Sequence, residues 1–306
     1  MRWGKQLDKQ RYKCKNCGLL YTRNDRPQLL INRFIWFKKW VLERQTYRTL
    51  IRDSGYSKDT LQRTFYKLLE QAPKVSIIKR SQVHLRMDAT YFSKFCLIAY
   101  QDNDDGYTQL IRFSDGEHFE EIKEDLNNLI KLGVQLESIT TDGDKSTLKA
   151  IKKSLPDVTV QRCLVHIQRI CLIWLTRYPK HIAGQELRLL VLMLLKIKTE
   201  NDRLHWTRSL NGWYHTHKTY INEKTFNPQT DRYWYTHKLL RRSYQTIKRA
   251  LPNMFHYLLN PAIPNTTNGI EGYFSHLKNH LDLHRGLTIK NRINFIKWYV
   301  HFSNEK

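Results

Sequence analysis

The sequence predicts an α/β protein with a strongly basic, mostly helical N-terminal region. Two observations lead to this prediction: strand-like segments follow one another closely between residues 84 and 163, and the segments between and after them have helical apolar spacing. The chain has 306 residues, of which 41% are hydrophobic and 12% aromatic, so it can bury a sizeable core. We expect a main domain and a smaller one.

The strand-like segments begin with an antiparallel meander, because three of them are separated only by short turns. Helices and further strands then alternate. The expected strands are 84–92, 94–102, 108–115, 138–144 and 158–163, and the expected helices between them are 118–133 and 145–155. With the helix that follows, the order βββαβαβα is that of the ribonuclease-H-like fold, in which the first and fourth strands are adjacent.

The C-terminal half of the chain is expected to be helical. Residues 164–256 are rich in Trp, Tyr, His, Lys and Arg and contain no strand pattern of comparable strength, so we expect only helices there. Residues 266–302 predict two further helices. Trp206, Trp213 and Trp234 could stack on nucleic-acid bases, but core packing is the favoured interpretation for each.

The charge of the chain is high and unevenly distributed. The formal net charge is +24, which indicates a polyanionic partner, most simply nucleic acid, although a ribosome-associated or membrane-surface protein would also be basic. Residues 1–80 contain 20 Lys and Arg against 6 Asp and Glu, whereas residues 81–145 contain 6 against 13. This contrast predicts a nucleic-acid-binding module joined to a site that needs carboxylates.

Nothing in the sequence predicts export or membrane insertion. The start, MRWGKQLDKQRYK, is polar and basic, and the longest apolar run, LLVLMLL at 189–195, is too short to span a bilayer. Five cysteines without an export signal favour reduced thiols. We therefore expect a cytoplasmic protein, associated with the nucleoid of a prokaryote, and no membrane partner.

Two cysteines near the start form half of a zinc knuckle. Cys14 and Cys17 lie in RYKCKNCGLLYT (11–22), and Gly18 would allow the tight turn behind the second thiolate. Since no Cys or His precedes Cys14, the pair is interpreted as a remnant of a zinc ribbon or as two unliganded thiols on a hairpin. Bound zinc is not expected here, but these are the better candidates if zinc binds at all.

Residues 42–69 predict a helix–turn–helix. Leu42, Tyr47, Leu50 and Ile51 form the apolar stripe of the first helix, and Gly55 marks the turn. Ser57 is expected to cap the second helix, in which the apolar positions are Leu61, Phe65, Leu68 and Leu69. The basic side chains of that helix, Lys58, Arg63 and Lys67, are candidates for contacts to DNA.

Three acidic residues have the setting of a catalytic site. Asp88 lies within the apolar first strand, where an unpaired carboxylate is costly to bury. Asp142 ends the fourth strand and precedes Gly143, so we expect it to face Asp88. Glu271 lies on a later helix that begins near Asn268 and could add a third oxygen ligand for Mg²⁺ or Mn²⁺. Asp102 and Asp144 are interpreted as surface or capping residues.

Four segments resemble the Mutator-like DDE transposases of insertion sequences: MDATYF (87–92), TTDGDKS (140–146), RCLVHIQR (162–169) and TTNGIEGYFSHLK (266–278). The resemblance covers nearly the whole chain. It implies a ribonuclease-H-like catalytic domain at 81–306 with an all-helical insertion at about 170–260. It also implies a partial zinc-ribbon-like knuckle at 1–30 and a helix–turn–helix DNA-binding region at 31–75.

The resemblance also implies roles for individual residues. Asp88, Asp142 and Glu271, spaced 54 and 129 residues apart, would bind two Mg²⁺ or Mn²⁺ ions and catalyse phosphoryl transfer. Cys163 and His166 form the C-x-x-H motif of the family, at the head of the insertion. We expect His166 to face the active site or the DNA and Cys163 to pack beneath it. Arg241, Arg242 and Asn268 are candidates for contacts to DNA or for support of the site, and Lys248 and Arg249 are further DNA-contact candidates.

The expected function is transposition of an insertion sequence. The protein would bind the two ends of this DNA element, nick a DNA strand there with water as the nucleophile, and join the freed 3′-hydroxyl to target DNA. The partner is double-stranded DNA, both terminal inverted repeats and target, and a homodimer is expected because two ends must be held together. Two alternatives stay open. One is a nuclease or resolvase on the same fold, and the other is a DNA-binding protein derived from a transposase that has lost catalysis.

Overall fold

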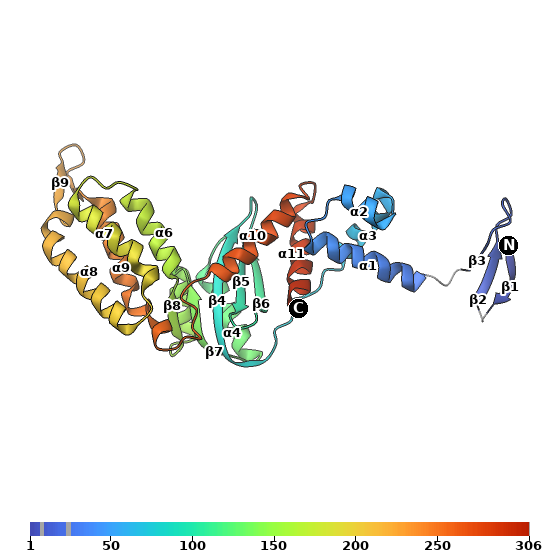
Figure 1. Cartoon of the computed structure of the whole chain (residues 1–306), viewed down its shortest axis with the longest axis horizontal. Coiled ribbons are helices and arrows are strands. Elements are labelled where there is room, and N and C mark those ends of the chain that lie inside the picture. Colours follow the sequence, from blue (N-terminus) through green and yellow to red (C-terminus); the bar gives the residue numbers. More distant parts are fainter. Residues whose placement is uncertain (7–8, 23–25, 306) are drawn as a thin grey trace. The chain divides into compact units, whose positions relative to one another are not determined.

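The computed structural model describes residues 1–6, 9–22 and 26–305, and the chain divides into two compact units. One unit consists of Met1–Lys74 and Ser275–Lys306, and the other of Val75–Phe274. The single catalytic domain predicted at 81–306 stays a prediction. Figure 1 labels the elements of both units. Among the described residues no helix is both long and apolar enough to cross a membrane.

The second unit is built on a five-stranded mixed sheet in the order β6-β5-β4-β7-β8 (Figure 1). The first three strands pair antiparallel, and β4–β7 and β7–β8 pair parallel. The five predicted strands are all present, and the predicted neighbours, the first and fourth, pair along β4 and β7. Their bounds are β4 Arg80–Tyr91, β5 Cys96–Asp102, β6 Thr108–Ser114, β7 Val134–Thr141 and β8 Thr159–Arg162.

Two helices pack on this sheet and form its main apolar core. They are α4 (Phe119–Lys131) and α5 (Lys145–Ser154), and both were predicted. Their buried residues, which include Ile122, Leu126 and Ile151, pack against Leu85 and Ile98 of the sheet. All seven residues of β5, an interior strand of the sheet, are buried. This packing holds the carboxyl end of β7 next to β4.

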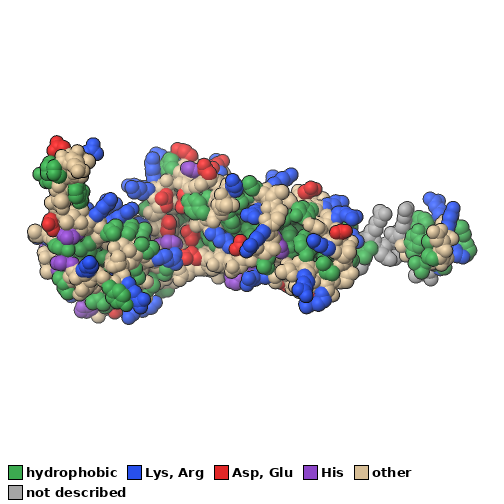
Figure 2. Space-filling model, turned by 90° about the horizontal axis from the view of Figure 1, so that it is seen from above, with side chains coloured by type: hydrophobic (Ala, Val, Ile, Leu, Met, Phe, Trp, Pro, Cys, Tyr) green, Lys and Arg blue, Asp and Glu red, His purple; other side chains and the backbone are tan. Residues whose placement is uncertain are grey.

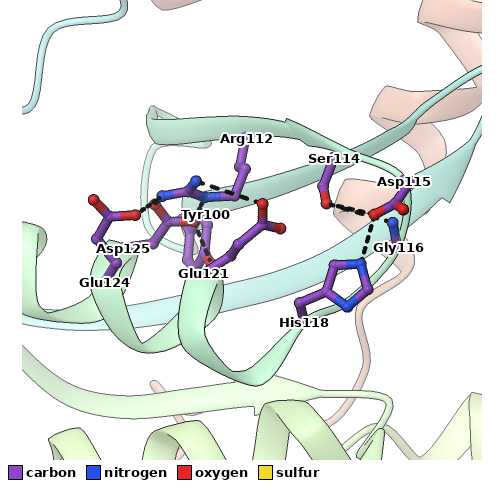
Figure 3. Close-up of polar contacts among 9 residues, drawn as sticks. All are labelled: Tyr100, Arg112, Ser114, Asp115, Gly116, His118, Glu121, Glu124 and Asp125. Carbon is purple, nitrogen blue, oxygen red and sulfur yellow. Dashed lines mark hydrogen bonds and ion pairs between the residues drawn. The ribbon is translucent and has the colours of Figure 1, made fainter.

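A buried ion pair fixes α4 to the sheet (Figure 3). Arg112 on β6 donates two hydrogen bonds to Asp125 on α4, at 2.6 and 2.7 Å, and the Tyr100 hydroxyl on β5 donates a third at 3.0 Å. The Asp125 side chain is only 3% exposed, so this bidentate pair compensates the cost of burying its charge. Because the ion pair joins β6 to α4, it also fixes the two ends of the turn between them, which follows Ser114.

The insertion between β8 and the end of the unit has its own apolar core, which contains Trp206 and Trp213. The favoured interpretation of these two as core residues is confirmed, since their indole N–H groups donate to the backbone oxygens of Leu190 and Ala183. The insertion consists of α6 Leu164–Leu175, α7 Ile182–Met193, η1 Leu194–Lys196, α8 Glu200–Ile221, β9 Lys224–Asn227, β10 Arg232–Tyr235, α9 Lys238–Ala250, η2 Leu251–Asn253 and η3 His256–Leu258.

The prediction of an all-helical insertion is wrong at one place, the hairpin β9–β10. Its strands pair antiparallel, and Phe226 lies opposite Tyr233 with ring centroids 4.9 Å apart. Aromatic residues that pair across two short strands stabilise a hairpin, and the turn residues of NPQTD separate them. Trp234 lies on this hairpin and is 46% exposed, so the core interpretation does not hold for it.

The first unit contains a small sheet and a helical bundle. The sheet strands β1 Arg2–Gln6, β2 Lys9–Lys13 and β3 Leu20–Thr22 are antiparallel. Residues 7–8 and 23–25, which belong to the predicted knuckle segment 1–30, lie outside the described residues. The helices are α1 Arg26–Leu42, α2 Tyr47–Ser54, α3 Lys58–Glu70, α11 Ile289–Asn304 and, from Ser275 onward, α10 Asn268–Asp282. Helix α10 spans the boundary between the two units.

The core of this bundle is aromatic. Phe37, Phe65 and Trp298 pack together, and Phe37 lies 5.6 Å from Phe65 and 5.3 Å from Trp298 between ring centroids. The Trp298 indole donates to the backbone oxygen of Leu68 at 2.9 Å. Residues 275–306 thus pack with the N-terminal helices.

The predicted boundaries around α3 are confirmed, but the first predicted helix starts too early. Gly55 has a left-handed φ of +72° at the turn, and the Ser57 hydroxyl accepts from the Thr60 N–H at 3.3 Å. Placing Leu42 in the first helix of the pair was wrong, because Leu42 ends α1. Arg44 adopts a φ of +50°, which breaks the helix before α2 begins.

Candidate active site

Asp88 lies near the end of β4, largely buried. Burial raises the pKa of its carboxyl group to about 7. The positive charge of His166 and a hydrogen bond from the Ala89 N–H at 2.9 Å oppose this rise, while the negative charges of Asp142 and Glu271 add to it. A carboxylate in this setting favours either a proton or a cation.

Asp142 follows β7 directly, beside Asp88. The parallel register pairs Arg86 with Thr140, so Asp88 and Asp142 come two residues further along their strands. Gly143 has a φ of +84°, and a side chain there would overlap the Arg162 guanidinium, which donates to the Asp142 backbone oxygen at 2.8 Å. Glycine is therefore required at this position, as its place in the sequence suggested.

Glu271 lies in the first turn of α10 and approaches the same region from another part of the chain. Arg169 on α6 donates to its Oε2 at 3.0 Å. Its Oε1 is buried and has no hydrogen-bond partner within the described chain. Gly269, two residues earlier, lies against the Arg86 guanidinium, so a side chain there would push the start of α10 away from β4.

Cys163 and His166 join the sheet to the insertion at the start of α6. Cys163 is fully buried, and its Sγ accepts from the backbone N–H and the hydroxyl of Thr267, both at 3.3 Å. Although burial opposes it, hydrogen bonds from His166 and Thr267 lower the pKa of the thiol. The hydrogen bond to Cys163 raises the pKa of His166 to about 9, against the effect of burial, and the charges of Cys163, Asp88 and Asp142 add to the rise.

His166 lies close to Asp88 and Glu271. One ligand atom each from Asp88, His166 and Glu271 lie within 4.8 Å of one another, and the His166 Nδ1 is 3.7 Å from the Glu271 Oε1. This is the one group of three candidate metal ligands within the described ranges. The sequence predicted Asp88 and Glu271 together with Asp142, whereas Asp142 lies outside this tight group and raises the pKa of Asp88 from nearby.

Asp142 instead lines a cavity of about 400 Å³ beside the group, together with His166, Arg169 and Glu117. Glu117 was missed by the sequence analysis. Burial, together with the charges of Asp142 and Asp144, raises the pKa of Glu117 to about 7. The Thr147 hydroxyl donates to its carboxylate at 3.3 Å.

Glu117 lies in the turn between β6 and α4. In this turn Asp115 accepts one hydrogen bond from the Ser114 hydroxyl and pairs with His118 (Figure 3). Glu117 follows β6, whose carboxyl end lies at the same edge of the sheet as those of β4 and β7, and this is the signal that could have identified it. On the face shown in Figure 2, acidic side chains and a histidine gather in a hollow bordered by Lys and Arg.

Of the two acidic residues that were interpreted as surface or capping residues, Asp144 is a cap, whereas Asp102 does not lie at the surface. Asp144 is the N-cap of α5 and accepts from the backbone N–H groups of Ser146 and Thr147 at 2.7 and 3.3 Å. Asp102 is buried and pairs with Arg80 at 3.0 Å.

The remaining predicted residues do not belong to the group of Asp88, His166 and Glu271. Cys14 and Cys17 lie on the turn between β2 and β3, and the described chain brings no third Cys, His, Asp or Glu within ligand distance of them. Backbone N–H groups of Cys17 and Asn16 lower the pKa of the Cys14 thiol. The predicted DNA contacts lie on helices: Lys58, Arg63 and Lys67 are exposed on α3, Arg241 and Arg242 lie on α9, and Asn268 is exposed at the start of α10.

The comparisons with known proteins identify the family. No curated protein matches the chain. Residues 59–221, more than half of the chain, match the family described as "Transposase, Mutator family". The matched range contains Asp88, Glu117, Asp142 and His166. The chain belongs to the Mutator family of transposases.

Proposed function

We propose that this chain is a DDE transposase of an insertion sequence, which cleaves DNA at the element ends and joins the freed ends to target DNA. The observation that carries the proposal is the grouping of Asp88 on β4 with Glu271 on α10, with Asp142 close enough to raise the pKa of Asp88. The sheet order, with three antiparallel strands followed by two parallel ones, supports a ribonuclease-H-like core. Membership of the Mutator family supports the transposase activity.

The residues of the site fit a divalent cation. The Glu271 Oε1 is buried without a hydrogen bond in the described chain, and the Asp88 carboxyl group is destabilised as an anion by burial. Both features favour a cation at these carboxylates. Asp88, Asp142 and Glu271 would hold Mg²⁺ or Mn²⁺, two ions in the proposed mechanism. When bound, such ions supply Lewis-acid stabilisation of the charge that develops at the phosphorus during phosphoryl transfer.

The neighbouring side chains have positioning roles in this proposal. Arg169 holds one oxygen of Glu271 and leaves the other directed toward Asp88 and His166. His166 provides a positive charge beside the carboxylates, and Cys163 and Thr267 fix its ring from beneath. Arg169 is 53% exposed, so the same guanidinium can also contact a phosphate at the mouth of the site.

The proposal assigns recognition of the element ends to the first unit. Helices α2 and α3 would act as a helix–turn–helix, with Lys58, Arg63 and Lys67 on the helix that contacts DNA. The turn with Cys14 and Cys17 would be the remnant of a zinc ribbon. Within the second unit, Arg241, Arg242 and Asn268 would contact DNA near the site. Because two ends must be held together, the active form would be a homodimer.

The test uses duplexes that carry the terminal sequence of the element, incubated with the full-length protein and Mg²⁺ or Mn²⁺. Wild type is compared with Asp88→Asn, Glu271→Gln and, as a matched control, Asp144→Asn. We expect cation-dependent nicking and strand transfer by wild type and by the Asp144 variant, and neither reaction by the other two. Equal product from all four proteins would refute the assignment of the site.

Two other outcomes would point to the alternatives. Cleavage without joining, at any DNA concentration, would identify a nuclease or resolvase. Binding of the ends without cleavage by any of the proteins would identify a DNA-binding protein that has lost catalysis.

A further inference from the structure

We propose that the insertion contains a binding pocket for an unpaired nucleotide base of the DNA that the active site processes. The pocket is a cavity of about 360 Å³, formed by the ends of α6, α7 and α8 and the start of α9. It is separate from the cavity beside Asp142, and none of its lining residues is acidic. The inference rests on the proposed function, because it assigns the occupant to the same DNA.

Aromatic rings at this pocket are already held in place. The Tyr220 ring lies between His181 and His237, with centroids 3.7 and 3.6 Å apart and interplanar angles of 11° and 23°. The Nδ1 of His181 accepts from the Ala183 N–H at 3.1 Å, and His237 pairs with Glu223 at 2.8 Å. Three rings from three elements thus form a rigid stack at the wall of the cavity.

Trp174 supplies a further aromatic wall from α6. The Arg242 guanidinium lies 4.4 Å from the centroid of its indole ring. No ion pair to a carboxylate forms at Arg242, Lys180 or Lys238 in the part of the chain that the structure describes, which leaves these cations available for phosphate groups. Aromatic rings together with cations are how proteins bind single-stranded nucleic acid, since bases stack on the rings and phosphates pair with the cations.

The charge of the whole insertion favours the same occupant. Residues 164–256 contain 16 Lys and Arg against 5 Asp and Glu. A small neutral or cationic ligand would gain nothing from this excess, whereas a nucleic-acid strand would be attracted by it.

Two helices connect this pocket to the active site. On α6, Arg169 and Ile173 line the cavity beside Asp142, and Trp174 lines the base pocket. On α9, Thr246 lines the cavity beside Asp142 and Leu239 lines the base pocket. From His166 to Trp174 the rise along α6 is ~12 Å, about the rise of three to four nucleotides along B-form DNA. A base that leaves the duplex near the cleaved bond can therefore reach the pocket.

The position of the pocket suggests its use. Extruding a base from the stack costs free energy, and a preformed aromatic pocket compensates this cost. We infer that the pocket holds a displaced base of the cleaved end and so keeps the strand in register with the carboxylates.

The test measures equilibrium binding by fluorescence anisotropy in EDTA, so that no DNA is cut. Three DNAs are compared: a blunt duplex, the same duplex with a short unpaired tail, and the same tail made of abasic nucleotides. The last two carry equal numbers of phosphates, so the ratio of their dissociation constants reports recognition of the bases alone. For wild type we expect the tail with bases to bind about tenfold tighter.

Two variants address the pocket, and each has a matched control. Trp174→Leu removes the aromatic wall, and Phe226→Leu removes an exposed aromatic ring that does not line the pocket. Leu239→Glu places a negative charge at a 48% exposed lining position, and Leu189→Glu does so on α7 away from the lining. Thermal unfolding verifies that each variant is folded. The pocket variants should bring the ratio close to one, and the controls should keep the wild-type ratio.

Each possible outcome decides the proposal. A ratio near one for wild type, or an unchanged ratio in the folded Leu239→Glu protein, would overturn it. If the blunt duplex is bound and cut while the ratio is one, the base pocket fails and the proposed function stands. If no DNA is bound or cut, both fail together.

Discussion

The substitution Asp88→Asn should stabilise the protein in the absence of divalent cations. Asn cannot ionise, but its oxygen can keep the hydrogen bond from the Ala89 N–H. In the wild type, burial raises the pKa of Asp88 from 3.8 to about 7. A raised acid pKa means that the folded protein holds the proton more tightly than the unfolded chain does. Stability is therefore lost as the pH rises from about 4 to about 7.

The magnitude follows from the size of this rise. A difference of about three pKa units corresponds to about 4 kcal/mol of lost stability once the pH exceeds 7. For a unit of this size that is a rise in Tm of roughly 10 °C for the variant at pH 8. The advantage of the variant should shrink steadily as the pH is lowered toward 4, where the wild-type carboxyl group is protonated in both states.

Differential scanning calorimetry in EDTA at pH 8 and pH 5 measures this difference, with Asp144→Asn as the control. Addition of Mn²⁺ should then raise the Tm of the wild type. At a Mn²⁺ concentration one hundred times the dissociation constant of the site, the gain in the free energy of unfolding is ~2.7 kcal/mol. The same addition should leave the Asp88→Asn protein nearly unchanged. A wild type that is the more stable protein in EDTA at pH 8, or an equal Mn²⁺ response of both proteins, would refute the reasoning.

Three further predictions concern stability alone. Burial lowers the pKa of His284 to about 4, so the folded protein takes up this proton less readily than the unfolded chain does. The free energy of unfolding should therefore fall by about 3 kcal/mol as the pH falls from 6.5 toward 4. His284→Gln should remove this loss, as measured by urea unfolding at pH 7.5 and 4.5. Asp144→Ala should cost about 1 kcal/mol because it removes the N-cap of α5, and an unchanged urea midpoint would contradict this. Arg112→Met should cost about 3–5 kcal/mol because Asp125 stays buried without its partner, and the double variant with Asp125→Leu should recover most of it in the same assay.

The catalytic half of the fold could be predicted because its patterns are local. Each strand from β4 to β8 has its own apolar or alternating segment, and turn residues separate them. The pairing of β4 with β7 then brought Asp88 next to Asp142, as expected. Glu271 required the resemblance, since nothing local shows that α10 returns to this sheet.

Other features depend on packing that no local pattern reveals. Glu117 occupies a turn, and only the folded chain shows that this turn faces Asp142 and Asp144. No local pattern shows that His166 groups with Asp88 and Glu271, and only the resemblance led to the expectation that it faces the active site or the DNA. The association of residues 275–306 with the N-terminal helices rests on contacts such as Trp298 with Phe37, which are far apart in the sequence.

The most direct test of the central claim, that Asp88 and Glu271 hold the catalytic cation, is cleavage of end DNA by cysteine variants in different metals. A thiolate is a poor ligand for Mg²⁺ and a better one for Mn²⁺. We predict that Asp88→Cys and Glu271→Cys are inactive in Mg²⁺ and regain cleavage in Mn²⁺, while Asp144→Cys cleaves in both. Cleavage by Asp88→Cys in Mg²⁺ at the wild-type rate would contradict the claim.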